Sequence, residues 1–219
     1  LVRRFGPVPA PRAVHILTQA CDSLHEAHLR AMIHRDVKPT NLFLCRLGTT
    51  YDFCKLLDFG LVKRCLPEDS SMLTAAGTAT GTPAFMAPEV ASSQSIDARA
   101  DLYGLGCVAY WLLTGCLVFD EPTPTATIIA QIQKPPARPS ERVEACIPPA
   151  LEDIVMACLA KDPSQRPESA AALKAMLQSC PGVNAWPPSD AERWWRINAP
   201  QSPETDAGAA QERPVDTGS

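Results

Sequence analysis

The chain has 219 residues, of which 46% are hydrophobic and 20% are charged, and its formal net charge is -4. This length and composition allow one domain with a sizeable core, with or without a tail, and exclude both a small stapled scaffold and a chain that is disordered throughout. Lysine and arginine are scattered rather than clustered, so we predict no nucleic-acid partner.

A long helix is predicted near the start of the chain. After Pro11, four apolar residues and one histidine recur at steps of three and four residues. This is the spacing of a helix with one buried face. The residues in this pattern are Val14, Leu17, Cys21, Leu24 and His28.

A small pair of strands is predicted next. Two short apolar runs, residues 41–46 and 53–58, are separated by the turn-like sequence LGTTYD, an arrangement that is typical of a hairpin. The following segment, residues 64–80, is rich in serine, threonine, alanine and glycine and shows no periodicity, so we predict a long loop there.

Four further helices are predicted in the second half of the chain. Their patterns cover residues 98–114, 123–133, 149–159 and 167–178. The stretch 102–119 is uncharged and barely long enough to cross a bilayer, but its glycines, Thr114 and the carboxylates at both ends favour a helix buried in a large core. We therefore predict no membrane segment in this chain.

The composition shifts toward proline, aspartate, alanine and glycine after Cys180. One amphipathic stretch, DAERWWRI, predicts a short helix that contains tryptophan. From Asn198 onward we expect disorder. The predicted organisation is a main domain over residues 1–179, an extension over 180–197 and a tail over 198–219.

The nine cysteines include no CxxC pair and have no histidine close by at metal-ligand spacing. An odd number of such cysteines is typical of reduced, mostly buried thiols, so we predict a cytoplasmic location and no structural zinc site.

Three short motifs occur in a fixed order along the chain. HRDVKPTN runs from His34 to Asn41, DFG covers residues 58–60, and APE covers residues 87–89. Any one of the three motifs alone would be weak evidence, but the ordered set resembles the signature of the protein kinases. The resemblance covers residues 1 to about 177. It implies a mainly α protein-kinase-like carboxyl-terminal lobe, a helical bundle with a small β-hairpin that carries the catalytic loop and DFG.

The resemblance implies specific roles for the polar residues of these motifs. Asp36 would accept or orient the proton of the attacking hydroxyl group, and Lys38 would steady the transferred phosphoryl group. Asn41 and Asp58 would hold Mg²⁺, so that the implied cofactors are ATP and magnesium ions. Taken alone, an Asp or Asn after an extended segment more often caps a turn, and it is the DFG downstream that favours the catalytic interpretation.

The resemblance also implies a substrate class and a regulatory contact. Lys38, together with Thr82 in GTPAFMAPE, resembles the serine/threonine branch, so the implied partner is a protein with a Ser or Thr acceptor. Arg35 resembles an arginine that pairs with a phosphorylated loop residue. The candidate loop sites are Thr74, Thr78 and Thr80, and a merely solvated loop stays open as the alternative.

Other matched residues imply structural roles. Asp101 would anchor the catalytic loop from beneath, and Glu89 would form an ion pair with Arg166. We predict that His34 is a packed structural residue rather than a catalytic one. Phe59 and Gly60 complete the DFG motif as structural residues. The stretch DLYGLGCVAYWLLTG and the tryptophan-containing extension most resemble the eukaryotic-like serine/threonine kinases of bacteria.

Several family features are not found in this sequence. It has no GxGxxG before a strand, no VAIK-type lysine and no helix that would supply the glutamate partner of that lysine. We therefore expect a truncated kinase whose amino-terminal lobe is missing, and which binds ATP poorly and transfers phosphate hardly at all by itself.

Two alternatives stay open at this stage. The chain could be a catalytically inactive binding module or decoy, although binding alone does not require residues that hold a metal. It could also be a small-molecule phosphotransferase of the aminoglycoside type. Those enzymes resemble the HxDxxxxN pattern of this chain, but they lack a lysine at the position of Lys38 and the DFG and APE motifs.

Overall fold

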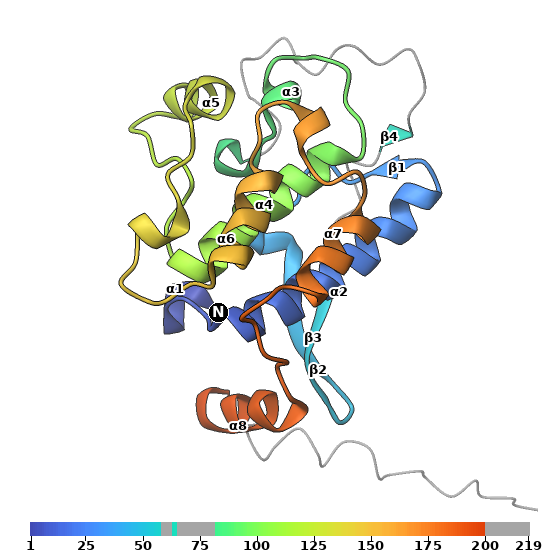
Figure 1. The fold of residues 1–219 in the computed structure, drawn as a ribbon. Helices are drawn as coiled ribbons and strands as arrows, with labels where there is room; N and C mark the ends of the chain where they lie inside the picture. Colours follow the sequence, from blue (N-terminus) through green and yellow to red (C-terminus); the bar gives the residue numbers. More distant parts are fainter. Residues whose placement is uncertain (58–62, 65–81, 200–219) are drawn as a thin grey trace, which may run out of the picture.

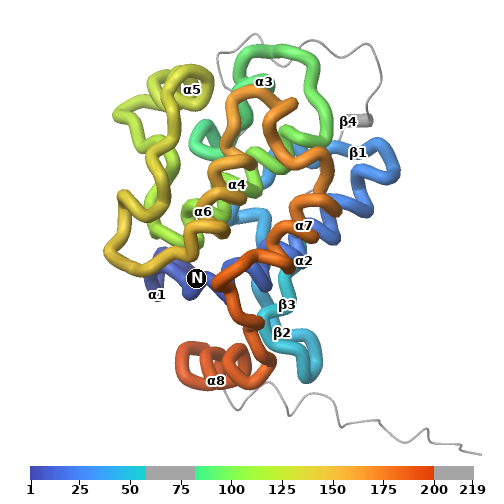
Figure 2. Tube along the Cα trace, viewed as in Figure 1, coloured from blue at the N-terminus to red at the C-terminus, as the bar shows by residue number. Residues whose placement is uncertain are grey.

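The computed structural model describes residues 1–57, 63–64 and 82–199. Helices form most of this part, with two small antiparallel sheets beside them (Figure 1). The structure is therefore mainly α, as predicted. Helix α4, Arg99–Thr114, runs through the middle of the lobe and packs on α2, Ala10–Leu29, and on α6, Pro149–Cys158 (Figure 2). Helix α7, Ala170–Gln178, packs along α2.

Helix α2, Ala10–Leu29, is the long helix predicted near the start of the chain. Pro9 and Pro11 frame its first turn, where a missing backbone N–H group is harmless. Its inward side is fully buried, including Leu17, Cys21 and Leu24. Because this side faces both α4 and α7, α2 is a central support of the lobe.

Helix α4, Arg99–Thr114, is buried on almost every side, as the sequence predicts. Gly115 ends it with a left-handed backbone conformation, φ 73°. Two internal glycines allow neighbouring segments to approach closely: a Cβ atom on Gly106 would lie 2.6 Å from Cys158 Cβ. In the described part of the chain, no helix combines the length and the apolar character needed to span a membrane.

Substitution of Gly106 by alanine is expected to destabilise the lobe by about 1–3 kcal/mol, because the added methyl group overpacks the contact between α4 and α6. Urea denaturation of the wild-type and variant chains measures the difference in the free energy of unfolding. An unchanged midpoint would contradict the close approach of these two helices.

The predicted hairpin consists of β2, Leu42–Leu47, and β3, Thr50–Leu56. Its turn is shorter than the predicted segment 47–52, because Leu47 already pairs with Thr50 and Gly48 adopts a positive φ of 58°. A register shift between Cys45 and Leu47 marks an irregularity in β2.

A second small sheet was not predicted. It pairs β1, Met32–Ile33, with β4, Lys63–Arg64. Each strand has only two residues, which is too short to show an alternating pattern in the sequence. Arg64 belongs to this sheet rather than to the predicted loop, and residues 65–81 lie outside the described part.

The later helices follow the predicted segments with small changes at their ends. Helix α5 is Pro124–Gln133, α6 is Pro149–Cys158, α7 is Ala170–Gln178 and α8 is Pro188–Asn198. Helix α7 begins three residues later than predicted, because the side chain of Ser169 caps it by accepting a hydrogen bond from the Ala172 N–H group. Helix α8 includes Asn198, where the tail was expected to begin.

Several one-turn elements were not predicted, because they are too short to establish a period. Helices α1, Val2–Phe5, and α3, Pro88–Ala91, belong to this group. The short 3-10 turns η1, η3, η4 and η5 are Pro39–Asn41, Pro83–Phe85, Pro139–Glu141 and Pro163–Gln165. In each of these turns proline provides the fixed φ of the first residue.

Candidate active site

The backbone of the HRD segment is held by the buried carboxylate of Asp101. Asp101 Oδ2 accepts a hydrogen bond from the His34 N–H group at 2.8 Å, and Oδ1 accepts one from the Arg35 N–H group at 2.7 Å. The side chain of His28, on α2, lies 2.8 Å from Asp101 Oδ2. Because Arg35 has a positive φ of 63°, these bonds stabilise a backbone conformation that is unfavourable for a non-glycine residue.

His34 is fully buried between the loop and the hairpin. Its Nδ1 accepts a hydrogen bond from the Asp36 N–H group at 3.3 Å, so Nε2 is the protonated nitrogen that donates to the Leu57 carbonyl at 2.9 Å. His34 thus ties the loop to the end of β3. We still interpret it as a structural residue.

Asp36, Lys38 and Asn41 lie together after this anchor. Lys38 Nζ is 2.7 Å from Asp36 Oδ2. Asn41 Nδ2 donates to the same Asp36 oxygen at 3.1 Å and to the Asp36 carbonyl at 2.8 Å. The carboxylate remains 15% exposed, so it is accessible from solvent.

The end of the hairpin lies next to this cluster. The Leu57 N–H group donates to the Asn41 carbonyl at 2.8 Å, so the chain returns to the loop one residue before Asp58. Asp58, Phe59 and Gly60 themselves lie outside the described residues, as do the candidate phosphorylation sites Thr74, Thr78 and Thr80.

Arg35, which precedes Asp36, has a buried side-chain nitrogen. Its Nε has no hydrogen-bond partner within the described part of the chain. A buried guanidinium nitrogen without a partner is costly, which makes this atom a candidate for pairing with an anion.

Thr82 lies at the start of η3 and is exposed, and its carbonyl accepts a hydrogen bond from the Phe85 N–H group at 3.1 Å. Within the described residues, no hydrogen bond joins Thr82 to Asp36 or Lys38. The two segments nevertheless lie against the same point of α4: a Cβ on Gly104 would lie 2.9 Å from the Val37 carbonyl oxygen and 3.6 Å from that of Phe85.

The residue that holds η3 in place was not predicted from the sequence. Gln131, fully buried on α5, donates to the carbonyls of Pro83 and Ala84 at 3.2 and 2.8 Å. Tyr103 donates to the Gln131 side-chain oxygen, and Lys161 Nζ donates to its backbone carbonyl at 2.7 Å. Burial lowers the pKa of Lys161 to about 8. No local sequence pattern distinguishes Gln131 from a surface glutamine.

Glu89 and Arg166 form a buried, two-pronged ion pair. Arg166 NH1 lies 2.6 Å from Glu89 Oε1, and NH2 lies 2.8 Å from Oε2. Arg166 also donates to the backbone carbonyls of three other residues, Arg99, Ala160 and Lys161. The pair therefore links α3, which contains the APE glutamate, to the segment before α7.

A comparison with known protein families agrees with this fold and these contacts. The protein kinase domain family matches residues 1–177, so the chain belongs to the protein kinase family. The match includes the anchored HRD loop, the hairpin, the APE helix and the buried α4. It ends before α8.

Similar proteins include bacterial serine/threonine-protein kinases, which confirms the predicted branch. The chain is 43% identical over 172 residues to Serine/threonine-protein kinase Pkn1 of Myxococcus xanthus, covering 78% of the chain and 24% of that relative. It is 36% identical over 220 residues to Serine/threonine-protein kinase PknB of Mycolicibacterium smegmatis, covering 98% of the chain and 34% of the relative. The chain thus spans about a quarter to a third of the length of these relatives.

Proposed function

We propose that this chain forms the catalytic lobe of a serine/threonine protein kinase, which transfers the γ-phosphate of ATP to Ser or Thr hydroxyl groups of a protein substrate. The observation that supports this most directly is the cluster of Asp36, Lys38 and Asn41 on a loop held by Asp101. The bacterial serine/threonine kinases that it resembles support the same reaction.

The donor set fits a magnesium ion. Asn41 uses its amide nitrogen for Asp36, which leaves its oxygen as the atom that can bind a cation. Oxygen ligands are those that Mg²⁺ prefers, and the carboxylate of Asp58 is the second proposed ligand. When bound with ATP, the metal neutralises the charge that develops on the phosphoryl group.

The other residues of the loop have separate proposed roles in catalysis. The partly exposed Asp36 carboxylate orients the substrate hydroxyl group and accepts its proton. Lys38, beside it, provides a positive charge for the phosphoryl oxygens. Because Asp101 and His34 hold the loop backbone, these side chains need little reorganisation when substrate binds. Thr82, on its own segment against α4, is proposed to contact the substrate near Asp36.

We further propose that activity requires an amino-terminal lobe, because the chain contains no glycine-rich loop, strand lysine or matching glutamate. Phe43, next to the loop on β2, is 55% exposed and would be covered by such a lobe.

Arg35 is proposed as the receptor of a regulatory phosphate on Thr74, Thr78 or Thr80. Its buried Nε, which has no hydrogen-bond partner among the described residues, would donate a charge-assisted hydrogen bond to the phosphate. The cytoplasmic location remains a prediction from the cysteine pattern.

The decisive experiment compares the chain alone with a form joined to a kinase amino-terminal lobe. Both are supplied with Mg²⁺ and radiolabelled ATP, and phosphorylated residues in a protein substrate are identified by mass spectrometry. We expect phosphoserine or phosphothreonine only with the joined form. Comparable turnover by the chain alone would contradict the need for a further lobe. Labelling of a small molecule instead of protein would contradict the proposed substrate class, and no transfer by the joined form would favour a binding module.

A further inference from the structure

A buried carboxylate outside the kinase motifs receives four hydrogen bonds. Asp52, on β3, is fully buried and accepts from Arg12 Nε at 2.8 Å and from Arg12 NH2 at 2.7 Å. Two indole N–H groups complete the set: Trp186 donates at 2.9 Å and Trp195 at 2.7 Å. A buried ion pair is favourable only when such additional bonds satisfy its remaining lone pairs.

The Arg12 guanidinium is also enclosed by aromatic rings. It lies 3.8 Å from the ring centroid of Trp194 and 5.6 Å from that of Trp186. Trp194 in turn meets Phe5 edge to face, with ring centroids 5.0 Å apart. Arg12 is thus desolvated by the tryptophans, and a guanidinium stacked in this way is a strong partner for both charge and packing.

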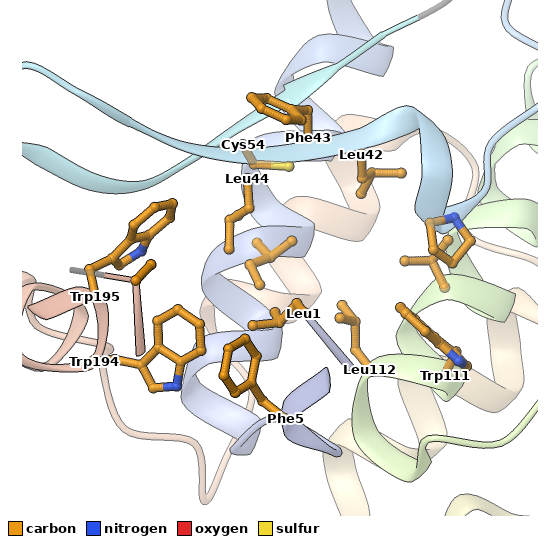
Figure 3. Close-up of a pocket in the computed structure, with 14 residues that line it drawn as sticks. Leu1, Phe5, Leu42, Phe43, Leu44, Cys54, Trp111, Leu112, Trp194 and Trp195 are labelled. Atoms are coloured by element: carbon orange, nitrogen blue, oxygen red, sulfur yellow. The ribbon is translucent and has the colours of Figure 1, made fainter. Parts of the chain in front are cut away.

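These tryptophans belong to the segment that follows the kinase match. The family match ends at residue 177, whereas Trp186 precedes α8 and Trp194 and Trp195 lie on it. Figure 3 shows both α8 indoles facing a pocket whose other walls include Phe5 and Leu44. The pocket has a volume of about 310 Å³, and α8 lies beside the hairpin in Figure 1.

The anchored strand leads directly to the candidate active site. Asp52 has a positive φ of 54°, so the β3 backbone is held in an unfavourable conformation at this point. Gln19 reinforces the anchor, donating to the Asp52 carbonyl at 2.9 Å and accepting from the Cys54 N–H group at 3.0 Å. Four residues beyond Asp52, Leu56 pairs with Leu42, which is adjacent to Asn41.

We propose that Trp186, Trp194 and Trp195 form a tryptophan latch that positions the β2–β3 hairpin. Through the Asp52 carboxylate, the latch fixes the strand pair whose open end, where Leu42 pairs with Leu56, lies next to Asn41. Trp186 and Trp195 are therefore positioning residues for metal binding, a consequence that rests on the proposed function. The extension after residue 177 would therefore be required for the structure of the catalytic lobe.

The test uses the double variant Trp186→Phe/Trp195→Phe of the whole chain, which removes two N–H donors and keeps aromatic rings. Trp111→Phe is the matched control: Trp111 lines the same pocket, and its indole N–H group bonds no residue in the described ranges. Hydrogen–deuterium exchange is measured peptide by peptide. We expect amides of the hairpin to exchange about tenfold faster or more in the double variant, with those of α6 unchanged and no change anywhere in the control.

Mn²⁺ binding, followed by electron paramagnetic resonance, provides the second measurement. We expect the double variant to bind Mn²⁺ several-fold more weakly than the wild type and the control. Unchanged hairpin exchange, or faster exchange that is equal in α6, overturns the latch. Faster hairpin exchange with unchanged Mn²⁺ affinity overturns its role in positioning the metal ligands. Wild-type chain that binds no Mn²⁺ contradicts the proposed metal site, while the exchange data still decide on the latch.

Discussion

Replacement of Asp36 by alanine is expected to lower the rate of protein phosphorylation by roughly 10²–10⁴-fold, the range typical of a lost general base. The measurement is kcat for a protein substrate in the form joined to an amino-terminal lobe. The loss should appear in kcat rather than in the KM for ATP, because the proposed contact is with the attacking hydroxyl group.

The structure indicates that this substitution spares the fold. The Asp36 carboxylate is partly exposed, and the Asp36 backbone carbonyl still accepts a hydrogen bond from Asn41 after the side chain is removed. The HRD backbone is held separately by Asp101. A circular dichroism melting curve close to that of the wild type is therefore expected.

Asp153→Ala is a suitable control. Asp153 is also a carboxylate paired with a cation, Arg138, but it is 67% exposed and lies on α6, outside the proposed site. It should retain wild-type turnover. Retention of substantial activity by Asp36→Ala would remove the catalytic role of Asp36, whereas a similar loss in Asp153→Ala would point to a general effect on folding.

Replacement of Arg166 by alanine is expected to destabilise the lobe by roughly 3–5 kcal/mol, the cost typical of breaking a buried ion pair. Glu89 would remain as a buried carboxylate without its cation, and the carbonyls of Ala160, Lys161 and Arg99 would each lose a donor. Urea denaturation measures the free energy of unfolding. If the variant does not fold, the complete loss of the cooperative unfolding transition also shows that the stability of the lobe depends on Arg166.

Two comparisons separate this effect from the loss of a surface contact. Lys134→Ala breaks an ion pair with Glu121 in which the lysine is 61% exposed, and its cost should stay below about 1 kcal/mol. The double variant Glu89→Leu/Arg166→Met removes both charges, so it should cost less than the sum of the single variants Glu89→Leu and Arg166→Met. Additive costs would show that the two side chains act independently.

The family and most of the helices could be predicted from the amino-acid sequence alone. The order of HRDVKPTN, DFG and APE was enough to indicate a protein kinase, and the steps of three and four residues after Pro11 predicted α2. The uncharged stretch 102–119 predicted a helix buried on all sides, and α4 covers this stretch as far as Thr114. Each of these signals is local, because a motif or a period is contained within neighbouring residues.

Short helices and strands, and the exact ends of the longer ones, were harder to predict from the sequence. The two-residue strands β1 and β4 have no period to detect, and they lie far apart in the sequence, since Met32 pairs with Arg64. The start of β3 at Thr50 depends on the positive φ of Gly48, which permits a turn shorter than its composition suggests.

The contacts between side chains that are far apart in the sequence became visible only in the folded chain. That Gln131 holds the carbonyls of η3, and that Asp52 joins Arg12 to two indoles more than 130 residues away, cannot be inferred from a periodic pattern. A pattern states that a residue faces inward, but it does not state what it faces. The contacts of a buried polar side chain depend on how whole helices and strands pack against one another. In the folded chain this packing leaves few buried polar groups without a hydrogen bond. These partners are therefore defined only by the folded chain.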